Sequence, residues 1–193
     1  MHIPLPDADI HYYPDFISHD ESIHYLESLL SDVSWQQNKI KMFGKTYDEP
    51  RLTAWYGEEG LRYKYSGIQL EATPWSMILN ELRHKVNAVA SVDFNSVLLN
   101  YYRDGQDSMG YHQDDESELG SNPTIASLTF GAERTFQLKH ISNKKIKRKD
   151  IPLTSGSLLI MAGTTQSFWK HQIPKTKKRI GPRINLTFRK IIT

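Results

Sequence analysis

The sequence predicts a mainly β fold with two helices, both in the first half of the chain. Eight short stretches have the alternation or the β-branched and aromatic content of strands, and only two have the helical period. The 193 residues contain no internal repeat and no linker-like segment, so a single domain is expected. Many short strands with few helices are typical of a sandwich or jelly roll, here backed by the helices.

Both predicted helices carry start signals. The first begins at Ser18, and Glu21 three positions later completes a capping box. The second has Thr73 as its expected cap and Pro74 as its first helical residue. The expected apolar faces are Ile23, Leu26 and Leu30 in residues 18–30, and Trp75, Ile78, Leu82, Val86 and Val89 in residues 73–89.

The last predicted strand has the most regular alternation. Its apolar face consists of Ile184, Leu186 and Phe188. The opposite face carries two guanidinium groups with two neutral hydrogen-bonding groups between them, although an exposed sheet face would look similar. These polar residues are Arg183, Asn185, Thr187 and Arg189. The eight strands are expected at residues 38–43, 52–56, 61–65, 95–102, 124–130, 134–140, 156–162 and 183–191.

Composition narrows the class of protein. Cysteine is absent, which excludes a disulfide framework and thiolate metal sites. No apolar stretch has the length of a membrane span, and the first residues lack a secretory pattern. We therefore expect a monomer without membrane attachment, in the cytoplasm or, in a eukaryote, the nucleus.

Charge is segregated along the chain. The residues from Arg134 onward hold 15 of the 24 Lys and Arg but a single acid, Asp150. Two segments, residues 139–149 and 175–179, are especially basic and are expected to be loops. A basic face that meets a polyanion would explain this pattern, and so would solvated lysine loops.

The segment "MGYHQDDESELG" places His112 and Asp114 two positions apart. On extended backbone their side chains point to the same side and can converge on one ion. The H-x-D pattern alone is also common in solvated loops, so a third ligand is required. His171 in "FWKHQIP" is a candidate, and two imidazoles with one carboxylate are the ligands of non-haem Fe(II) oxygenases. The other histidines, at positions 2, 11, 19, 24, 84 and 140, are expected at the surface.

Beside such an iron site, the polar face of residues 183–191 could bind a cosubstrate. Arginine binds carboxylates through bidentate, charge-assisted hydrogen bonds. The molecule 2-oxoglutarate has a carboxylate at each end, so two arginines on one face suit it.

These features together resemble the AlkB family of Fe(II)- and 2-oxoglutarate-dependent dealkylases. The motifs "NYYRDG", "HQDDESEL", "IASLTFGAERTF", "GSLLIMAG" and "RINLTFRKI" occur in order within residues 38–192, most similar to the subgroup that repairs alkylated double-stranded DNA. The resemblance implies a double-stranded β-helix, with Fe(II), 2-oxoglutarate and O₂ as cofactor and cosubstrates. It also implies oxidative demethylation of bases such as 1-methyladenine and 3-methylcytosine in double- or single-stranded DNA, with release of formaldehyde and succinate. RNA is a further candidate substrate.

The resemblance also implies roles for individual residues. His112, Asp114 and His171 match the iron ligands, and two sets of residues match the 2-oxoglutarate site. Arg183, Asn185 and Tyr102 lie at the far carboxylate, whereas Arg189 and Asn100 lie near the metal, with Thr187 on the same face. Residues 38–70 correspond to a substrate-binding lid, 95–192 to the catalytic core and about 1–37 to an N-terminal extension.

The substrate positions implied by the resemblance are Tyr63, Tyr65, Asp115 and Glu116 around the base, and Phe43 as a wedge in the duplex. Tyr65 departs from the subgroup, which usually has Phe there. The basic segments would meet phosphate. Two other functions remain open: an oxygenase that acts on RNA or protein, and a non-catalytic β-sandwich that binds nucleic acid.

Overall fold

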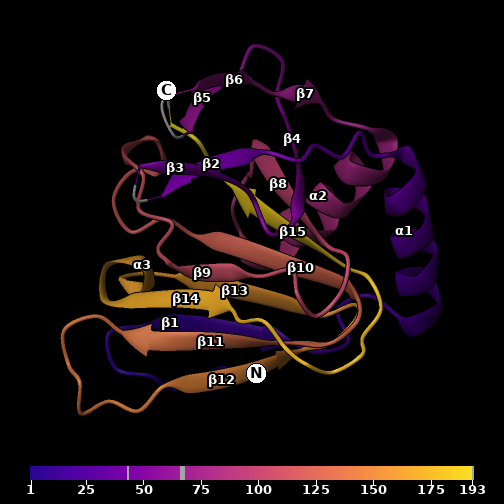
Figure 1. Cartoon of the computed structure of the whole chain (residues 1–193). Coiled ribbons are helices and arrows are strands. Elements are labelled where there is room, and N and C mark those ends of the chain that lie inside the picture. The colour runs from indigo at the N-terminus through magenta and orange to yellow at the C-terminus, as the bar shows by residue number, and fades with distance from the viewer. Residues whose placement is uncertain (43, 66–67, 193) are drawn as a thin grey trace.

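The computed structural model describes residues 1–42, 44–65 and 68–192, with the backbone alone at 41–42, 62–65 and 68–70 (Figure 1). Its helices are α1 (His19–Asp32), α2 (Met77–Ala90), α3 (Thr165–Phe168) and the 3-10 helix η1 (Ser117–Leu119). Its strands are β1 (Asp9–Tyr13), β2 (Lys39–Met42), β3 (Lys45–Asp48), β4 (Leu52–Gly57), β5 (Arg62–Tyr65), β6 (Ile68–Glu71), β7 (Thr73–Pro74), β8 (Ser96–Tyr102), β9 (Met109–His112), β10 (Ile125–Gly131), β11 (Arg134–His140), β12 (Lys149–Leu153), β13 (Leu158–Ala162), β14 (Trp169–Ile173) and β15 (Arg183–Arg189).

Two sheets make up the body of the protein. Seven strands form the larger sheet in the order β1-β13-β10-β15-β8-β4-β7, and four form the smaller one in the order β12-β11-β14-β9. The sheets lie one against the other, and α1 and α2 stand beside the larger sheet (Figure 1). The predicted jelly roll backed by helices from the first half of the chain is confirmed.

Two apolar clusters hold these layers together. One joins the helices to the larger sheet and includes Leu29, Leu82 and Phe188. The other lies between the sheets and includes Leu138 and Trp169. Residues that alternate along a strand of the larger sheet therefore face either the helices or the second sheet.

Strand β15 pairs with β10 on one side and β8 on the other. The predicted alternation is confirmed, since Ile184, Leu186 and Phe188 are fully buried in the cluster beneath the helices. The polar residues of β15 consequently point into the space between the two sheets.

The start signals were interpreted correctly for one helix only. Ser18 and Glu21 form the predicted capping box of α1. The prediction for the second helix is wrong: α2 begins after Ser76, whose hydroxyl accepts a hydrogen bond from the Leu79 backbone. Thr73 and Pro74 instead form β7, parallel to the end of β4. Pairing with the sheet therefore outweighs the local Thr-Pro signal.

The predicted apolar face of α1 is rotated relative to the observed one. Ile23 is 45% exposed, whereas Tyr25 and Leu29 are buried against the sheet. Leu26 and Leu30 pack at the edge of the same cluster. In α2, Leu82 and Val86 are buried as expected, but Val89 is exposed, and Leu79 takes its place in the core.

Two hairpins lie outside the main sheets. Strands β2 and β3 pair with each other, as do β5 and β6, each as a separate two-stranded sheet. The first hairpin pairs Met42 with Lys45, and Gly44 in its turn has a φ of 77°, a conformation that favours glycine. Phe43 lies outside the described residues.

Seven strands go beyond the eight expected from the sequence: β1, β3, β6, β7, β9, β12 and β14. They are short, and several pair with partners far away along the chain, so their local pattern is weak. In the described part of the chain, no helix is long and apolar enough to cross a membrane.

The observed helix face can be tested by truncation. Leu29→Ala should lower the free energy of unfolding by about 2–5 kcal/mol, because Leu29 is fully buried between α1 and the sheet. Ile23→Ala, its control on the same helix, should change it by no more than about 0.5 kcal/mol. Urea denaturation measures both, and a larger loss for Ile23→Ala would contradict this packing.

Candidate active site

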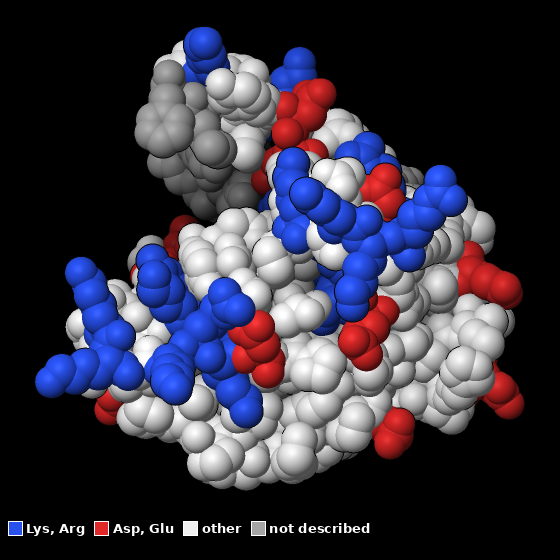
Figure 2. Space-filling view, turned by 60° about the horizontal axis from the view of Figure 1, so that its bottom comes forward, with Lys and Arg blue, Asp and Glu red and all other residues white. Residues whose placement is uncertain are grey.

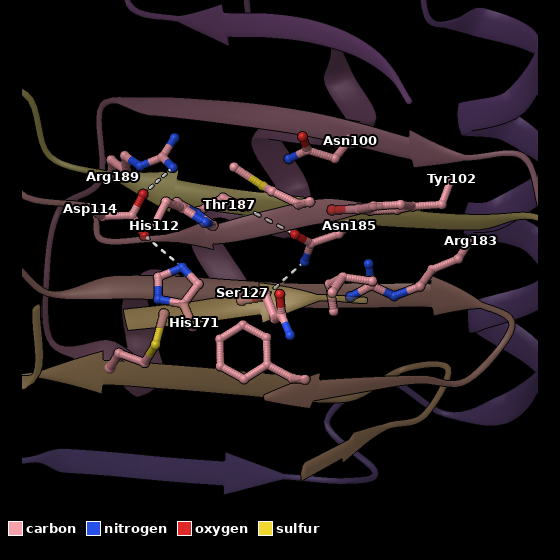
Figure 3. A pocket seen from close by; sticks show the side chains of 15 residues that line it. Asn100, Tyr102, His112, Asp114, Ser127, His171, Arg183, Asn185, Thr187 and Arg189 are labelled. Atoms are coloured by element: carbon pink, nitrogen blue, oxygen red, sulfur yellow. Dashed lines mark hydrogen bonds and ion pairs between the residues drawn. The ribbon is translucent and has the colours of Figure 1, made fainter. Parts of the chain in front are cut away.

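A pocket between the two sheets brings the predicted metal and cosubstrate residues together (Figure 3). Arg183 and Tyr102 lie at one end of it, and His112, Asp114, His171 and Arg189 lie at the other. Its full lining is Asn100, Tyr102, Met109, His112, Asp114, Ser127, Phe136, Met161, His171, Gln172, Ile173, Arg183, Asn185, Thr187 and Arg189.

Strand pairing places the two histidines of the metal end. His112 ends β9 and lies directly opposite His171 of β14, with ring centroids 4.2 Å apart. Asp114 follows two residues after β9, with Oδ2 3.5 Å from His171 Nε2. One donor atom from each of the three residues lies within 4.8 Å of the other two, so the group could hold a metal ion.

The charges at this end suit a divalent cation. Burial alone would raise the pKa of Asp114, but the charge of Arg189 and its hydrogen bond to the carboxylate hold it at about 2. Burial lowers the pKa of His171 to about 3, so this imidazole is neutral at physiological pH. His112 Nδ1 lies 2.9 Å from the Gly110 carbonyl and donates to it, which leaves Nε2 as the ligand atom. An ionised carboxylate and a neutral imidazole are the protonation states that metal binding needs, and Asp114 and His171 have them.

Gln166 of α3 supports the metal end and was not predicted. Its side-chain oxygen accepts a hydrogen bond from the Asp114 backbone N–H at 3.0 Å, and its carbonyl accepts one from the Gln113 side chain at 2.7 Å. Gln166 is 1% exposed, and its amide nitrogen lies 3.7 Å from Met161 Sδ. Nothing in the local sequence indicates this role, because residues 114 and 166 are brought together only by the fold.

Arg183 forms the opposite end of the pocket and is 1% exposed. Its Nη2 donates to Thr129 Oγ1 at 3.0 Å, and its guanidinium lies 5.1 Å from the Tyr102 ring centroid. Among the described residues, no acid lies within ion-pair distance of it, and its Nε and Nη1 have no hydrogen-bond partner. Burial lowers the pKa of Arg183 to about 10, so it remains cationic at neutral pH.

A buried cation without a counter-ion is costly, and an anionic ligand would remove that cost. The orphaned N–H groups of Arg183 can donate to an anionic ligand in the pocket. The donors at this end therefore fit the far carboxylate of 2-oxoglutarate.

Polar residues connect the two ends. Asn185 donates to Ser127 Oγ at 2.7 Å and accepts from Thr187 Oγ1 at 3.1 Å. Asn100 lies opposite Asn185 in the strand register, and its side-chain oxygen accepts from Arg51 Nε at 2.8 Å. Ser127 was not predicted as a site residue, although alternation along β10 places it on the pocket face.

Arg189 lies at the metal end of β15, and its Nη2 donates to Asp114 Oδ1. The same strand thus contacts both ends of the pocket.

A second cavity of about 190 Å³ opens beside the first and shares Arg189 with it. It lies on the inner side of β4 and β8, where Trp55 and Leu98 give it an apolar surface. The buried ion pair of Arg51 and Glu49, at 3.3 Å, contributes polar groups.

The predicted substrate residues are only partly described. Asp115 is exposed, and Glu116 is half-buried with Oε2 lacking a hydrogen-bond partner among the described residues. Tyr63 and Tyr65 belong to β5, but their side chains, like all of Phe43, lie outside the described part of the structure.

The support from Gln166 leads to a test. Gln166→Ala removes the acceptor of the Asp114 N–H and should lower the affinity for Co(II) by about 10- to 100-fold, as the loss of outer ligand contacts typically does. Calorimetric titration measures this affinity, and the exposed Gln106→Ala is the control. An unchanged affinity in the folded Gln166→Ala protein would show that Gln166 does not position the ligand.

Comparison with known proteins agrees with this geometry. A family model described as the 2OG-Fe(II) oxygenase superfamily matches residues 9–189. "Alpha-ketoglutarate-dependent dioxygenase alkB homolog 3" of Mus musculus is 45% identical over 187 residues, 93% of this chain and 65% of the relative. "DNA oxidative demethylase ALKBH2" of Homo sapiens is 40% identical over 179 residues, 90% of this chain and 69% of the relative. The chain thus spans slightly less than two thirds of the mouse homolog 3 protein.

Solved structures support the fold. The structure of OsALKBH1 superposes with a TM-score of 0.62 at 18% identity, covering 97% of this chain and 100% of the other. A prolyl hydroxylase from Trichoplax adhaerens, in complex with a hypoxia inducible factor peptide fragment, gives a TM-score of 0.65 at 12% identity and covers 94% of this chain and 83% of the other. The family match, together with the mouse homolog 3 and human ALKBH2 proteins, shows that this chain belongs to the 2OG-Fe(II) oxygenase superfamily, and within it to the AlkB homologues.

Proposed function

We propose that this chain is a dioxygenase that oxidatively demethylates N-alkylated bases in DNA, releasing formaldehyde and succinate. One observation carries the proposal: a single pocket holds a His-Asp-His group at one end and a buried, unpaired guanidinium at the other. Membership in the superfamily implies Fe(II), 2-oxoglutarate and O₂ as cofactor and cosubstrates. The name "DNA oxidative demethylase" of the ALKBH2 relatives supports DNA as the substrate.

In this proposal, His112, Asp114 and His171 hold the iron. When bound, the iron supplies the oxidising chemistry together with 2-oxoglutarate and O₂. Asp114 supplies negative charge, Arg189 keeps its carboxylate oriented, and Gln166 fixes its backbone.

The cosubstrate would lie along the polar face of β15. Arg183, with Asn185 and Tyr102 beside it, would bind the far carboxylate of 2-oxoglutarate, while Asn100 and Arg189 would serve the end near the metal. Thr187 would hold Asn185 in place through its hydroxyl. These groups orient the cosubstrate and exclude water from the pocket.

The damaged base would occupy the second cavity, next to the metal end. A base within a duplex must leave the stack before an enzyme can reach it. Tyr63 and Tyr65 would line this site. Glu116, with its unpaired Oε2, would accept a hydrogen bond from the base, and Asp115 would add negative charge. Carboxylates suit cationic lesions of the 1-methyladenine and 3-methylcytosine type.

The remaining surface would meet the DNA backbone. The predicted basic segment 139–149 is a loop only at residues 141–148, because residues 139–140 belong to β11 and Lys149 to β12. Residues 141–148 and 175–179 are largely exposed loops, and Figure 2 shows Lys and Arg side chains in distinct groups on one face. Residues 38–70, which contain both separate hairpins, would form the lid over a core of residues 95–192, with residues 1–37 as the N-terminal extension.

We propose that the protein acts as a monomer in the cytoplasm or, in a eukaryote, in the nucleus.

An assay of 2-oxoglutarate turnover and formaldehyde release tests the activity. Methylated DNA should give both products from the iron-loaded chain, and His171→Ala should give neither while remaining folded. Formaldehyde from methylated RNA alone would make RNA the substrate. Turnover of 2-oxoglutarate without any nucleic-acid product would favour a protein substrate, and nucleic-acid binding without iron binding would favour a non-catalytic binding protein.

The role of Arg183 gives a second prediction. Arg183→Lys keeps the charge but loses the planar pair of donors, so the dissociation constant for 2-oxoglutarate should rise at least about tenfold. Arg179→Lys, in an exposed loop, should leave it unchanged. Equal affinity of the Arg183→Lys and parent proteins would remove Arg183 from the cosubstrate site.

The proposed wedge residue between β2 and β3, Phe43, gives a third prediction. Phe43, flanked by Gly44 and basic residues, would fill the gap left by the flipped base, which offsets an unstacking cost of about a few kcal/mol that exists only in a duplex. Phe43→Ala should therefore reduce repair of double-stranded DNA far more than repair of single strands, with unchanged 2-oxoglutarate binding. The control is Met77→Ala, which removes an exposed apolar side chain on α2. Equal losses on both substrates, or a clear drop in thermal stability, would argue against a wedge.

A further inference from the structure

A second group of two histidines and one carboxylate lies at the outer surface, formed by His2, Asp9 and His11. His2 and His11 were expected to be ordinary surface histidines. Both lie at the surface, and the backbone of residues 1–3 pairs with β1, with Ile3 N–H bonded to the Ile10 carbonyl at 2.9 Å and Tyr12 N–H to the Met1 carbonyl at 2.8 Å. His140, also expected at the surface, is buried and lies 3.3 Å from Asp7.

These two backbone bonds make His2 and His11 a non-hydrogen-bonded antiparallel pair. Such pairs have the closer Cα atoms, about 4.5 Å apart, and bring the side chains together. The two imidazole centroids are 5.2 Å apart. The strand geometry therefore presents two imidazoles side by side on one face.

Asp9 lies two residues before His11 and shares its face. Its Oδ1 is 2.9 Å from His11 Nε2, and one donor atom from each of the three residues lies within 4.8 Å of the other two. Ile10 and Tyr12 alternate with these residues and are buried between the sheets. The cluster therefore faces outward, away from the pocket that holds His112.

The backbone beneath the cluster is fixed. Asp9 N–H donates to Thr165 Oγ1 at 2.9 Å, and Asp9 and His11 are both in register with β13. No Lys or Arg precedes Lys39 in the sequence, and the ion pair found for Asp9 among the described residues is the one with His11. The donors are thus held close together, which reduces the ordering cost of binding a cation.

We propose that His2, Asp9 and His11 form a second divalent metal site that ties residues 1–3 to β1. Imidazole ligands favour zinc, nickel or copper over magnesium or calcium, and the exposed carboxylate supplies charge. A metal bound there stabilises the folded chain by mass action, because His2 joins Asp9 and His11 only when residues 1–3 pair with β1. The site is separate from the proposed catalytic iron site and does not depend on it.

Zinc titration of the full, tag-free chain by calorimetry tests this site. The parent protein should bind two equivalents of Zn(II), His11→Asn one, Asp114→Ala one, and the double variant none. His24→Asn, an exposed histidine on α1, is the matched control and should bind two.

Thermal unfolding gives a readout that is independent of catalysis. Zn(II) should raise the unfolding temperature of Asp114→Ala, and this increase should be absent when His11→Asn is added. Two equivalents bound by His11→Asn, or no zinc bound by Asp114→Ala, would overturn the proposal.

Discussion

Strand β15 lies in the middle of the larger sheet and buries both of its faces, although one face carries two guanidinium groups. Its apolar face packs beneath the helices, and this packing fixes the direction of the polar face. Arg183 is consequently held between the sheets, where one hydroxyl and the Tyr102 ring are its described contacts. A buried cation without a counter-ion raises the free energy of the folded protein, and binding of an anion would lower it. In the proposed function, the fold would therefore hold Arg183 ready for a carboxylate before any ligand is bound.

The same strand connects this site with the metal end. Three further residues on its polar face follow Arg183, and the last of them, Arg189, contacts the Asp114 carboxylate. Strand β14 positions His171, and the pairing of β14 with β9 positions His112 opposite it. The metal end thus depends on strands of both sheets and on α3, which holds the Asp114 backbone through Gln166. The separation between the two ends of the pocket is set by the length of β15.

The sequence predicts those parts of the fold and the site that depend on local periodicity. Alternation in residues 183–191 places both faces of β15 correctly, and the H-x-D spacing brings His112 and Asp114 together. Gln166 and the burial of His140 depend on contacts between residues far apart along the chain, which a local pattern does not contain. The start of α2 is mispredicted for the same reason, since pairing with β4 takes Thr73 and Pro74 into the sheet. The cluster of His2 with His11 likewise follows from a backbone pairing that no spacing rule indicates.

The central claim is that the buried Arg183 binds the far carboxylate of 2-oxoglutarate. Calorimetric titration of the Mn(II)-loaded chain with 2-oxoglutarate and with 2-oxopentanoate tests it most directly, because the second compound has the same chelating end but a methyl group in place of the far carboxylate. Loss of a charge-assisted hydrogen bond should weaken binding of 2-oxopentanoate by at least about tenfold. Equal affinities for the two compounds would contradict the account.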